Sequence, residues 1–207
     1  MGATLHLITR LLLIWLLWTP FALASSSDYS LRIAAGIANQ NDFGEILSLQ
    51  SSEHPTHTAV AGMDVGYLIK RFEGPFEIYA KGGLYRFLEK SYQDDFFETT
   101  FYLKLYTHLD FWHNRVRIGA AEGVSYAFGI PTVERLEAQE NHDNNSHFLN
   151  YLEVSLDFDA GKLLHVTPLQ ETYLGYVLKH RSGIYGLINN VHRGGSNYNM
   201  FYIEHNF

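Results

Sequence analysis

The sequence predicts an all-β protein: an eight-stranded antiparallel transmembrane β-barrel with a filled lumen, following a cleaved signal peptide. Three observations lead to this fold class: an N-terminal export signal, eight segments of alternating apolar and polar residues, and connections that differ in length. Successive side chains of a strand point to opposite faces, so such alternation makes one face apolar and the other polar. A closed barrel of these strands turns its apolar face to lipid and its polar face inward.

Residues 1–24 have the three-part layout of a secretory signal peptide. Arg10 precedes an apolar run over residues 11–18, and the segment closes on the small-x-small sequence "ALA". An uncleaved N-terminal membrane anchor is the alternative, but the run is shorter than the ~20 residues that a spanning helix needs. We therefore expect residues 25–207 to form the barrel domain.

The composition excludes several classes of protein. The chain has no cysteine, which rules out a lipid-anchored lipoprotein and a disulfide-stabilised scaffold. Loss of the leader removes one of the 15 basic residues and none of the 22 acidic ones, so 14 against 22 gives a net charge of −8. Because the chain is acidic and shows no basic stripe, we expect no nucleic acid among its partners.

Eight segments carry the alternation and predict the strands. Each has about ten residues or more, the length that a tilted strand needs to cross a bilayer. In one of them Leu152 and Val154 alternate with Glu153 and Ser155. The eight segments are residues 29–39, 57–70, 76–90, 100–111, 116–128, 151–159, 171–186 and 196–207.

The connections between these segments also alternate. Residues 73–75, 112–115 and 160–168 are short or moderate, whereas residues 39–56, 92–98, 130–147 and 187–195 are mostly longer and more polar. An even number of strands, with short turns at one end and long polar loops at the other, is typical of bacterial outer-membrane barrels. We therefore expect the protein in the bacterial cell outer membrane, with both termini on the periplasmic side.

A secreted, soluble barrel of the lipocalin type alternates in the same way and is the main alternative. The polar faces favour the membrane barrel, because they carry charges of both signs that can pair inside a closed lumen. These residues are Arg32, Asp64, Lys81, Lys104, Asp157, Lys179 and Arg181. Side chains fill the interior of an eight-stranded barrel, so we expect no pore.

The last predicted strand ends on an aromatic residue, Phe207. In this the chain resembles bacterial outer-membrane proteins, in which the terminal aromatic residue is part of the signal for assembly. The resemblance implies the barrel assembly machinery and outer-membrane lipids as partners. His205 is an unusual member of the alternating positions that lead to Phe207.

A His-x-Ser pair, His180 and Ser182, lies in the seventh segment on the same face as Leu178. Because Lys179 and Arg181 belong in the lumen, His180 and Ser182 must face lipid, in the extracellular half of the strand. Their Cα atoms are then about 6.6 Å apart, close enough for an imidazole to activate a hydroxyl. Polar groups facing lipid are costly and therefore suggest a function. The simpler interpretation is that both groups bind lipid phosphates at the headgroup level.

A lipid-facing His-x-Ser on the penultimate strand of such a barrel resembles the lipid A 3-O-deacylase (PagL-like) family. The residue-level similarity is confined to about residues 176–199. The resemblance implies that Ser182 is a nucleophile and His180 its general base. It also implies a substrate, a fatty-acyl ester of lipid A in lipopolysaccharide. A non-catalytic structural or lipopolysaccharide-binding barrel is the alternative.

The family's third catalytic group is a Glu about a dozen residues after the Ser, and residues 194–199 contain no carboxylate. Asn197 and Asn199 share the outer face, and we expect this part of the last strand to run beside residues 182–186. Either amide can accept a hydrogen bond from His180 and fix its tautomer, although an amide cannot offset the charge of an imidazolium.

Acidic residues mark two further features. Glu122 has the parity of a lipid-facing residue, and we expect a β-bulge at the flanking glycines to turn it inward. The loop 130–147 is either a solvated acidic loop or a divalent-cation site beside lipopolysaccharide phosphates. Its acidic and histidine residues are Glu134, Glu137, Glu140, His142, Asp143 and His147. Since the chain has no Gly-rich phosphate loop and no cysteine metal motif, we expect no cofactor.

Overall fold

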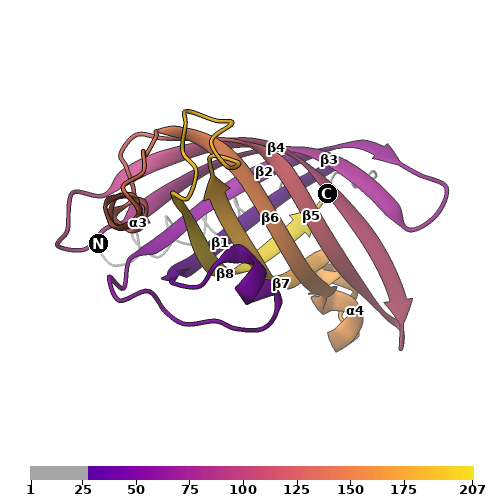
Figure 1. The fold of residues 1–207 in the computed structure, drawn as a ribbon. Coiled ribbons are helices and arrows are strands. Elements are labelled where there is room, and N and C mark those ends of the chain that lie inside the picture. The colour runs from indigo at the N-terminus through magenta and orange to yellow at the C-terminus, as the bar shows by residue number, and fades with distance from the viewer. Residues whose placement is uncertain (1–27) are drawn as a thin grey trace, which may run out of the picture.

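The computed structural model describes residues 28–207, and the expected signal peptide, residues 1–24, lies outside the described residues. Eight antiparallel strands pair in chain order and close into a barrel between β1 and β8, as Figure 1 shows. The strands are β1 (Tyr29–Asn39), β2 (Ala59–Arg71), β3 (Phe76–Leu88), β4 (Phe96–Phe111), β5 (Asn114–Ala127), β6 (Phe148–Asp159), β7 (Thr172–Ser182) and β8 (Gly195–Asn206). The predicted fold class is confirmed.

The first and last strands form the seam that closes the barrel. Their pairing is continuous from Ser30 to Asn39 of β1. At the end of the seam, the backbone N–H of Tyr29 donates to the carbonyl of Phe207 at 3.0 Å, and Phe207 returns the bond at 2.9 Å. Closure leaves none of the strands in residues 28–207 with unpaired backbone groups at an edge, which is the condition for a β-structure to lie in lipid.

The outer surface of the barrel is an apolar belt bordered by aromatic residues. Along β6, Leu156 is exposed, whereas its neighbours Ser155 and Asp157 are buried in the lumen. Exposed aromatic residues lie near both ends of the strands: Tyr29, Tyr67, Phe76 and Phe111 at one end, and Phe97, Tyr126, Phe128 and Phe148 at the other. An outward apolar band between two aromatic girdles is the surface of a barrel that spans a membrane.

The lumen is filled with paired charges and tyrosines. The predicted lumen residues Arg32, Asp64, Lys81, Lys104, Asp157, Lys179 and Arg181 are all buried. Arg32 bonds Asp64 at 2.6 Å and Glu153 at 2.9 Å. Glu204 accepts from Lys81 at 2.5 Å and from Arg117 at 3.1 Å. Because these buried charges are paired with one another, they can be closed off from water without leaving an isolated ion among them.

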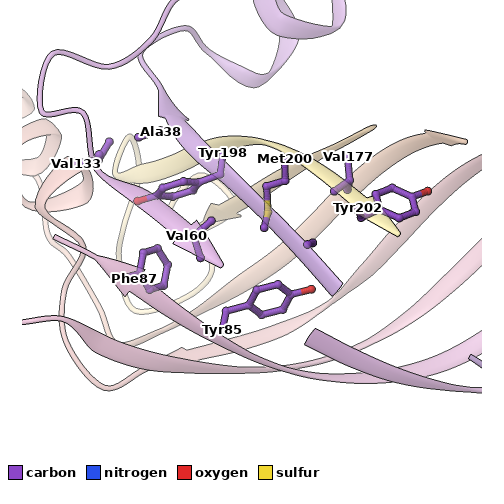
Figure 2. Close-up of a cluster of buried hydrophobic side chains, with 10 residues drawn as sticks. Ala38, Val60, Tyr85, Phe87, Val133, Val177, Tyr198, Met200 and Tyr202 are labelled. Atoms are coloured by element: carbon purple, nitrogen blue, oxygen red, sulfur yellow. The ribbon is translucent and has the colours of Figure 1, made fainter. Parts of the chain in front are cut away.

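A cluster of apolar side chains closes the lumen at the loop end of the barrel (Figure 2). Phe87 and Tyr198 pack edge to face, with ring centroids 5.4 Å apart. Val133 contributes to this cluster from α3 (Thr132–Asn141), a helix within the segment that we expected to be a polar loop. The first turn of α3 is buried, so the acidic loop is partly a plug for the barrel.

Three shorter helices complete the described chain: α2 (Phe43–Leu47), α4 (Ala160–Leu164) and the 3-10 helix η2 (Thr167–Leu169). α2 belongs to the connection between β1 and β2, whereas α4 and η2 belong to the connection between β6 and β7, at the other end of the barrel (Figure 1). Among residues 28–207, no helix is long and apolar enough to cross a membrane.

The prediction for the seventh strand was too long. β7 ends at Ser182, although the apolar alternation continues to Ile184. The chain turns at Gly183, where a Cβ atom would lie 2.2 Å from the carbonyl oxygen of Val191. Ile184 and Tyr185 then adopt left-handed φ angles of 48° and 53°, which a strand cannot contain.

Two expected orientations are also wrong. Glu122 faces outward and is exposed, because β5 pairs without a register shift, Glu122 lying opposite Leu103 on β4 and Leu152 on β6. The expected inward bulge does not form. The alternation of residues 57–70 gives Lys70 the lumen parity of Asp64, but Lys70 is exposed beyond a register shift between Leu68 and Lys70.

Candidate active site

The His-x-Ser pair lies on the outer face of β7, as its parity predicts. His180 and Ser182 are half-buried on this face, while the intervening Arg181 is buried in the lumen. In β8, Asn197 lies directly opposite His180. The His180 Nδ1 and Asn197 Oδ1 atoms are 2.7 Å apart, which is hydrogen-bonding distance.

This pairing differs in register from the one that we expected. We placed the start of β8 beside residues 182–186, but Ser182 lies opposite Gly195 and the residues that follow pair back along β7. The difference arises because β7 ends early at the turn after Ser182. As a result Asn197, rather than a residue further from the loop, lies across from His180.

A residue of the first long loop fixes the orientation of the Asn197 amide. Asn197 Nδ2 donates to the backbone carbonyl of Asn41 at 2.9 Å. Because a carbonyl accepts only, the NH₂ group must face Asn41 and the amide oxygen must face His180. The oxygen accepts from Nδ1–H, so the neutral ring carries its proton on Nδ1 and Nε2 is the nitrogen that can take up another.

Asn199, the other candidate for orienting His180, lies one outward position further along β8, opposite Leu178. Its Oδ1 accepts from the Tyr176 hydroxyl at 2.7 Å, and its Nδ2 donates to Ser51 Oγ at 2.7 Å. These partners hold Asn199 in a second polar contact between the strand and the first loop.

Ser182 is the last residue of β7 and lies opposite Asn150 on β6. The Cα atoms of His180 and Ser182 are about 7 Å apart along the strand. Asn150 is 6% exposed, and we did not predict it as a site residue. Asn150 has the same parity as Leu152, so the sequence places its amide on an otherwise apolar outer face, and that signal could have identified it.

The first long loop also covers His180 from outside, which the sequence did not indicate. The Phe43 ring of α2 packs against the His180 ring with their centroids 4.9 Å apart. In Figure 1, α2 lies at the outer wall near β7 and β8, where this contact places it. The loop therefore makes His180 part of an enclosed site on the barrel wall.

An apolar groove of about 670 Å³ lies on the outer wall further from the loops. Its lining residues come from β1, β6, β7 and β8: Ile33, Ala34, Ala35, Leu156, Phe158, Leu174, Gly175, Tyr176, Phe201, Tyr202 and Ile203. Tyr176 precedes His180 by two outward positions on the same strand, so the groove continues the line of the site toward the membrane interior.

The carboxylates of the described strands do not supply the missing third group. Glu204 is buried in the lumen with Lys81 and Arg117. Glu122 faces outward but is two strands from His180, with Leu152 between them. The group of β8 that contacts the His180 ring is therefore the amide of Asn197.

The acidic loop does not gather a metal site in the part of the chain that the structure describes: no three His, Asp or Glu side chains converge there. Glu134 is buried against Arg181 at 3.3 Å. Asp143 accepts from three successive backbone N–H groups, those of residues 192, 193 and 194, which hold its pKa well below the usual value.

A pocket of about 690 Å³ separates the first loop from α3 and reaches Asn197. Glu137 of α3 lines it, together with Asp42 of the first loop. Burial, reinforced by the negative charge of Asp42, raises the pKa of Glu137 to about 7. The charge of Glu137, which faces Asp42 across this pocket, therefore changes near neutral pH.

Comparisons with known proteins support the fold. No protein-family model matches the chain, and no curated protein matches it. The crystal structure of the outer membrane enzyme PagL is similar with a TM-score of 0.57 and 12% identity, over 86% of this chain and 99% of that one. The crystal structure of Neisserial surface protein A (NspA) is similar with a TM-score of 0.51 and 17% identity, over 88% and 98%.

At such low identity these similarities establish the fold and not the chemistry. The chain is an eight-stranded barrel of the outer-membrane type. Together with the apolar belt and its aromatic girdles, this fold assigns the protein to the outer membrane.

Proposed function

We propose that this protein is an ester hydrolase that removes a fatty-acyl chain from lipid A of lipopolysaccharide. Ser182 is the nucleophile, His180 the general base and Asn197 the residue that orients His180. The observation that carries the proposal is the 2.7 Å contact between His180 and Asn197 on the lipid-facing wall, one outward position from Ser182. A histidine held in one tautomer beside a hydroxyl is the arrangement that activates a serine.

The reaction follows from these positions. Nε2 of His180 takes the proton of the Ser182 hydroxyl as Oγ attacks the acyl carbonyl. The tetrahedral intermediate collapses with cleavage of the ester C–O bond, and His180 returns the proton to the departing sugar oxygen. Water then hydrolyses the acyl-enzyme by the same route and releases the fatty acid. We assign the oxyanion donor to the amide of Asn150, which lies opposite Ser182.

The surroundings of the site suit a lipid substrate. Acyl esters of a membrane lipid lie where the headgroups meet the chains, and His180 lies in the loop half of β7. The apolar groove of about 670 Å³ on the membrane side can receive an acyl chain. On this proposal lipopolysaccharide and the surrounding outer-membrane lipids are the ligands, and the barrel assembly machinery inserts the protein.

An amide in place of a carboxylate predicts slow turnover. Replacing the triad Asp by Asn in a serine protease costs ~10⁴-fold in kcat, in part because the histidine is held in the wrong tautomer. Here Asn41 turns the amide oxygen toward His180, so the productive tautomer is retained. What Asn197 still lacks is the negative charge with which a carboxylate would stabilise the imidazolium of His180.

Mass spectrometry of lipid A tests the proposal in cells that express the protein. We expect the loss of one acyl chain with the unaltered protein, and intact lipid A with Ser182→Ala. Ser91→Ala, which changes an exposed serine of another loop, is the matched control and should behave like the unaltered protein. Intact lipid A in all three, with every protein folded in the outer membrane, would refute the proposal and leave a structural or lipopolysaccharide-binding barrel.

A further inference from the structure

One stretch of the outer wall is not available to lipid. Leu178 has the parity of a lipid-facing residue, yet only 1% of its surface is exposed. Further along the neighbouring strand, on the same face, Phe201 is 75% exposed. A segment of the chain therefore covers the wall at Leu178 and leaves the wall at Phe201 open.

The covering segment is residues 41–51, in the connection between β1 and β2. It contacts the wall at three points: the Asn41 carbonyl on Asn197 at 2.9 Å, the Phe43 ring on His180 at 4.9 Å, and Ser51 Oγ on Asn199 at 2.7 Å. Each contact falls on a polar residue of the outer face of β7 or β8. The cover therefore lies over the site and not at a random place on the barrel.

The cover is held by few contacts of its own. Ile46 is the only buried residue of α2, and Leu49 at the end of the segment is 94% exposed. A segment with one buried side chain and a few hydrogen bonds to the wall belongs to the least stable part of a fold. Both ends are anchored, by a bridge between Asn39 and Glu53 and by the β-strands on either side. Such a segment can leave the wall without disturbing the barrel.

We propose that residues 41–51 form a movable cover whose part from Phe43 to Ser51 must leave the His180–Asn197 site before a lipid can reach Ser182, while the Asn41 carbonyl stays on Asn197. The role of the cover in substrate access rests on the proposed hydrolysis, whereas the movement of the cover can be tested without it. When the cover is closed, Phe43 occupies the space beside His180 that a substrate would need. When it is open, the site is continuous with the apolar groove along β7 and β8.

A reversible cross-link tests this movement. The chain has no cysteine, so the double variant Ser51→Cys/Asn199→Cys introduces the only two thiols. These positions are in contact, and a short bis-methanethiosulfonate linker that a reductant removes can join them. Diethylpyrocarbonate modification, read by peptide mass spectrometry on folded protein in detergent, reports access to His180. Exposed His113, in the turn between β4 and β5, is the internal reference.

We expect the cross-link to slow the modification of His180 severalfold relative to His113, and reduction to restore it. The variant Phe43→Ala, without the linker, should speed it. Equal modification of His180 in the linked and reduced forms would overturn the proposal. Hydrolysis of lipid A should follow the same pattern. If the linker slows the modification of His180 while no form of the protein hydrolyses lipid A, the movable cover is supported and the proposed function is refuted.

Discussion

In the proposed mechanism, the reaction depends on the direction of one amide, that of Asn197. Its NH₂ group is bound to a backbone carbonyl of Asn41, which leaves only the oxygen for His180. Substitution of the Asn41 side chain would not remove this contact, because the acceptor is a main-chain carbonyl. The loop thus sets the tautomer of a histidine on a strand far from it in sequence.

Asn197→Asp should raise the rate of hydrolysis about tenfold or more, because a carboxylate of the same size would offset the charge of the imidazolium. The aspartate would give up the bond to the Asn41 carbonyl, but it can still accept from Nδ1–H. The rate of fatty-acid release from lipid A in detergent measures the effect. Asn145→Asp, at an exposed position of another loop, is the control and should change little. An unchanged or lower rate in folded Asn197→Asp would contradict the assigned role of Asn197.

Among the elements, the strands were predictable and their ends were not. Alternation located all eight strands, because a barrel wall between lipid and a polar lumen imposes a period of two on each of them. β7 was overextended because its end is set by the close approach of Gly183 to Val191, eight positions further along the chain, which the alternation does not record. The predicted register between β7 and β8 was wrong for the same reason.

The candidate site was only partly predictable. Parity was sufficient to place His180, Ser182 and Asn197 on one face. The contacts of Asn41 and Phe43 arise from how the first long loop folds back on the wall, and no periodic pattern records that. Parity also gave no indication of α3, whose first turn is buried although the sequence of this segment is polar.

The contact between the first loop and α3 should weaken as pH rises. The pKa of Glu137 is raised by burial and by Asp42 from 4.5 to about 7 in the folded protein. The protonated form is therefore favoured by folding, and its stabilisation is complete below about pH 4.5 and lost as pH rises through 7. Glu134 and Glu140 add negative charge, whereas the N–H of Gly195 bonds Glu137 and opposes the shift.

Hydrogen exchange of residues 41–51, expressed as protection factors, measures this effect. Protection should be lower at pH 8 than at pH 5, and Glu137→Gln should remove most of the difference. Glu140→Gln, at an exposed position of the same helix, should retain it. If protection is equal at the two pH values in the unaltered protein, the ionisation of Glu137 does not act on the loop.

The whole barrel depends on the charge network of its lumen. Glu204 connects β8 to three other strands of this network. It pairs with Lys81 of β3 and Arg117 of β5, and it accepts a hydrogen bond from Tyr106 of β4. Removal of one partner from a buried network leaves uncompensated charges, whereas a surface ion pair contributes little.

Glu204→Ala should therefore lower the free energy of unfolding by about 3–5 kcal/mol. Denaturant unfolding in detergent, followed by the gel shift between folded and unfolded barrel, measures the loss. Arg86→Ala, which removes the exposed member of the surface ion pair with Asp95, should cost at most about 1 kcal/mol. Similar losses in the two variants would show that the lumen network does not stabilise the barrel as its burial implies.

Covalent capture of the nucleophile is the most direct test of the proposed chemistry on the outer wall. A long-chain alkyl fluorophosphonate reacts with an activated serine hydroxyl and releases fluoride, and peptide mass spectrometry locates the adduct. The folded protein should carry one adduct, on Ser182, and His180→Gln should carry almost none although its serine is intact. Absence of an adduct on Ser182, or equal labelling in His180→Gln, would contradict a serine that is activated by His180.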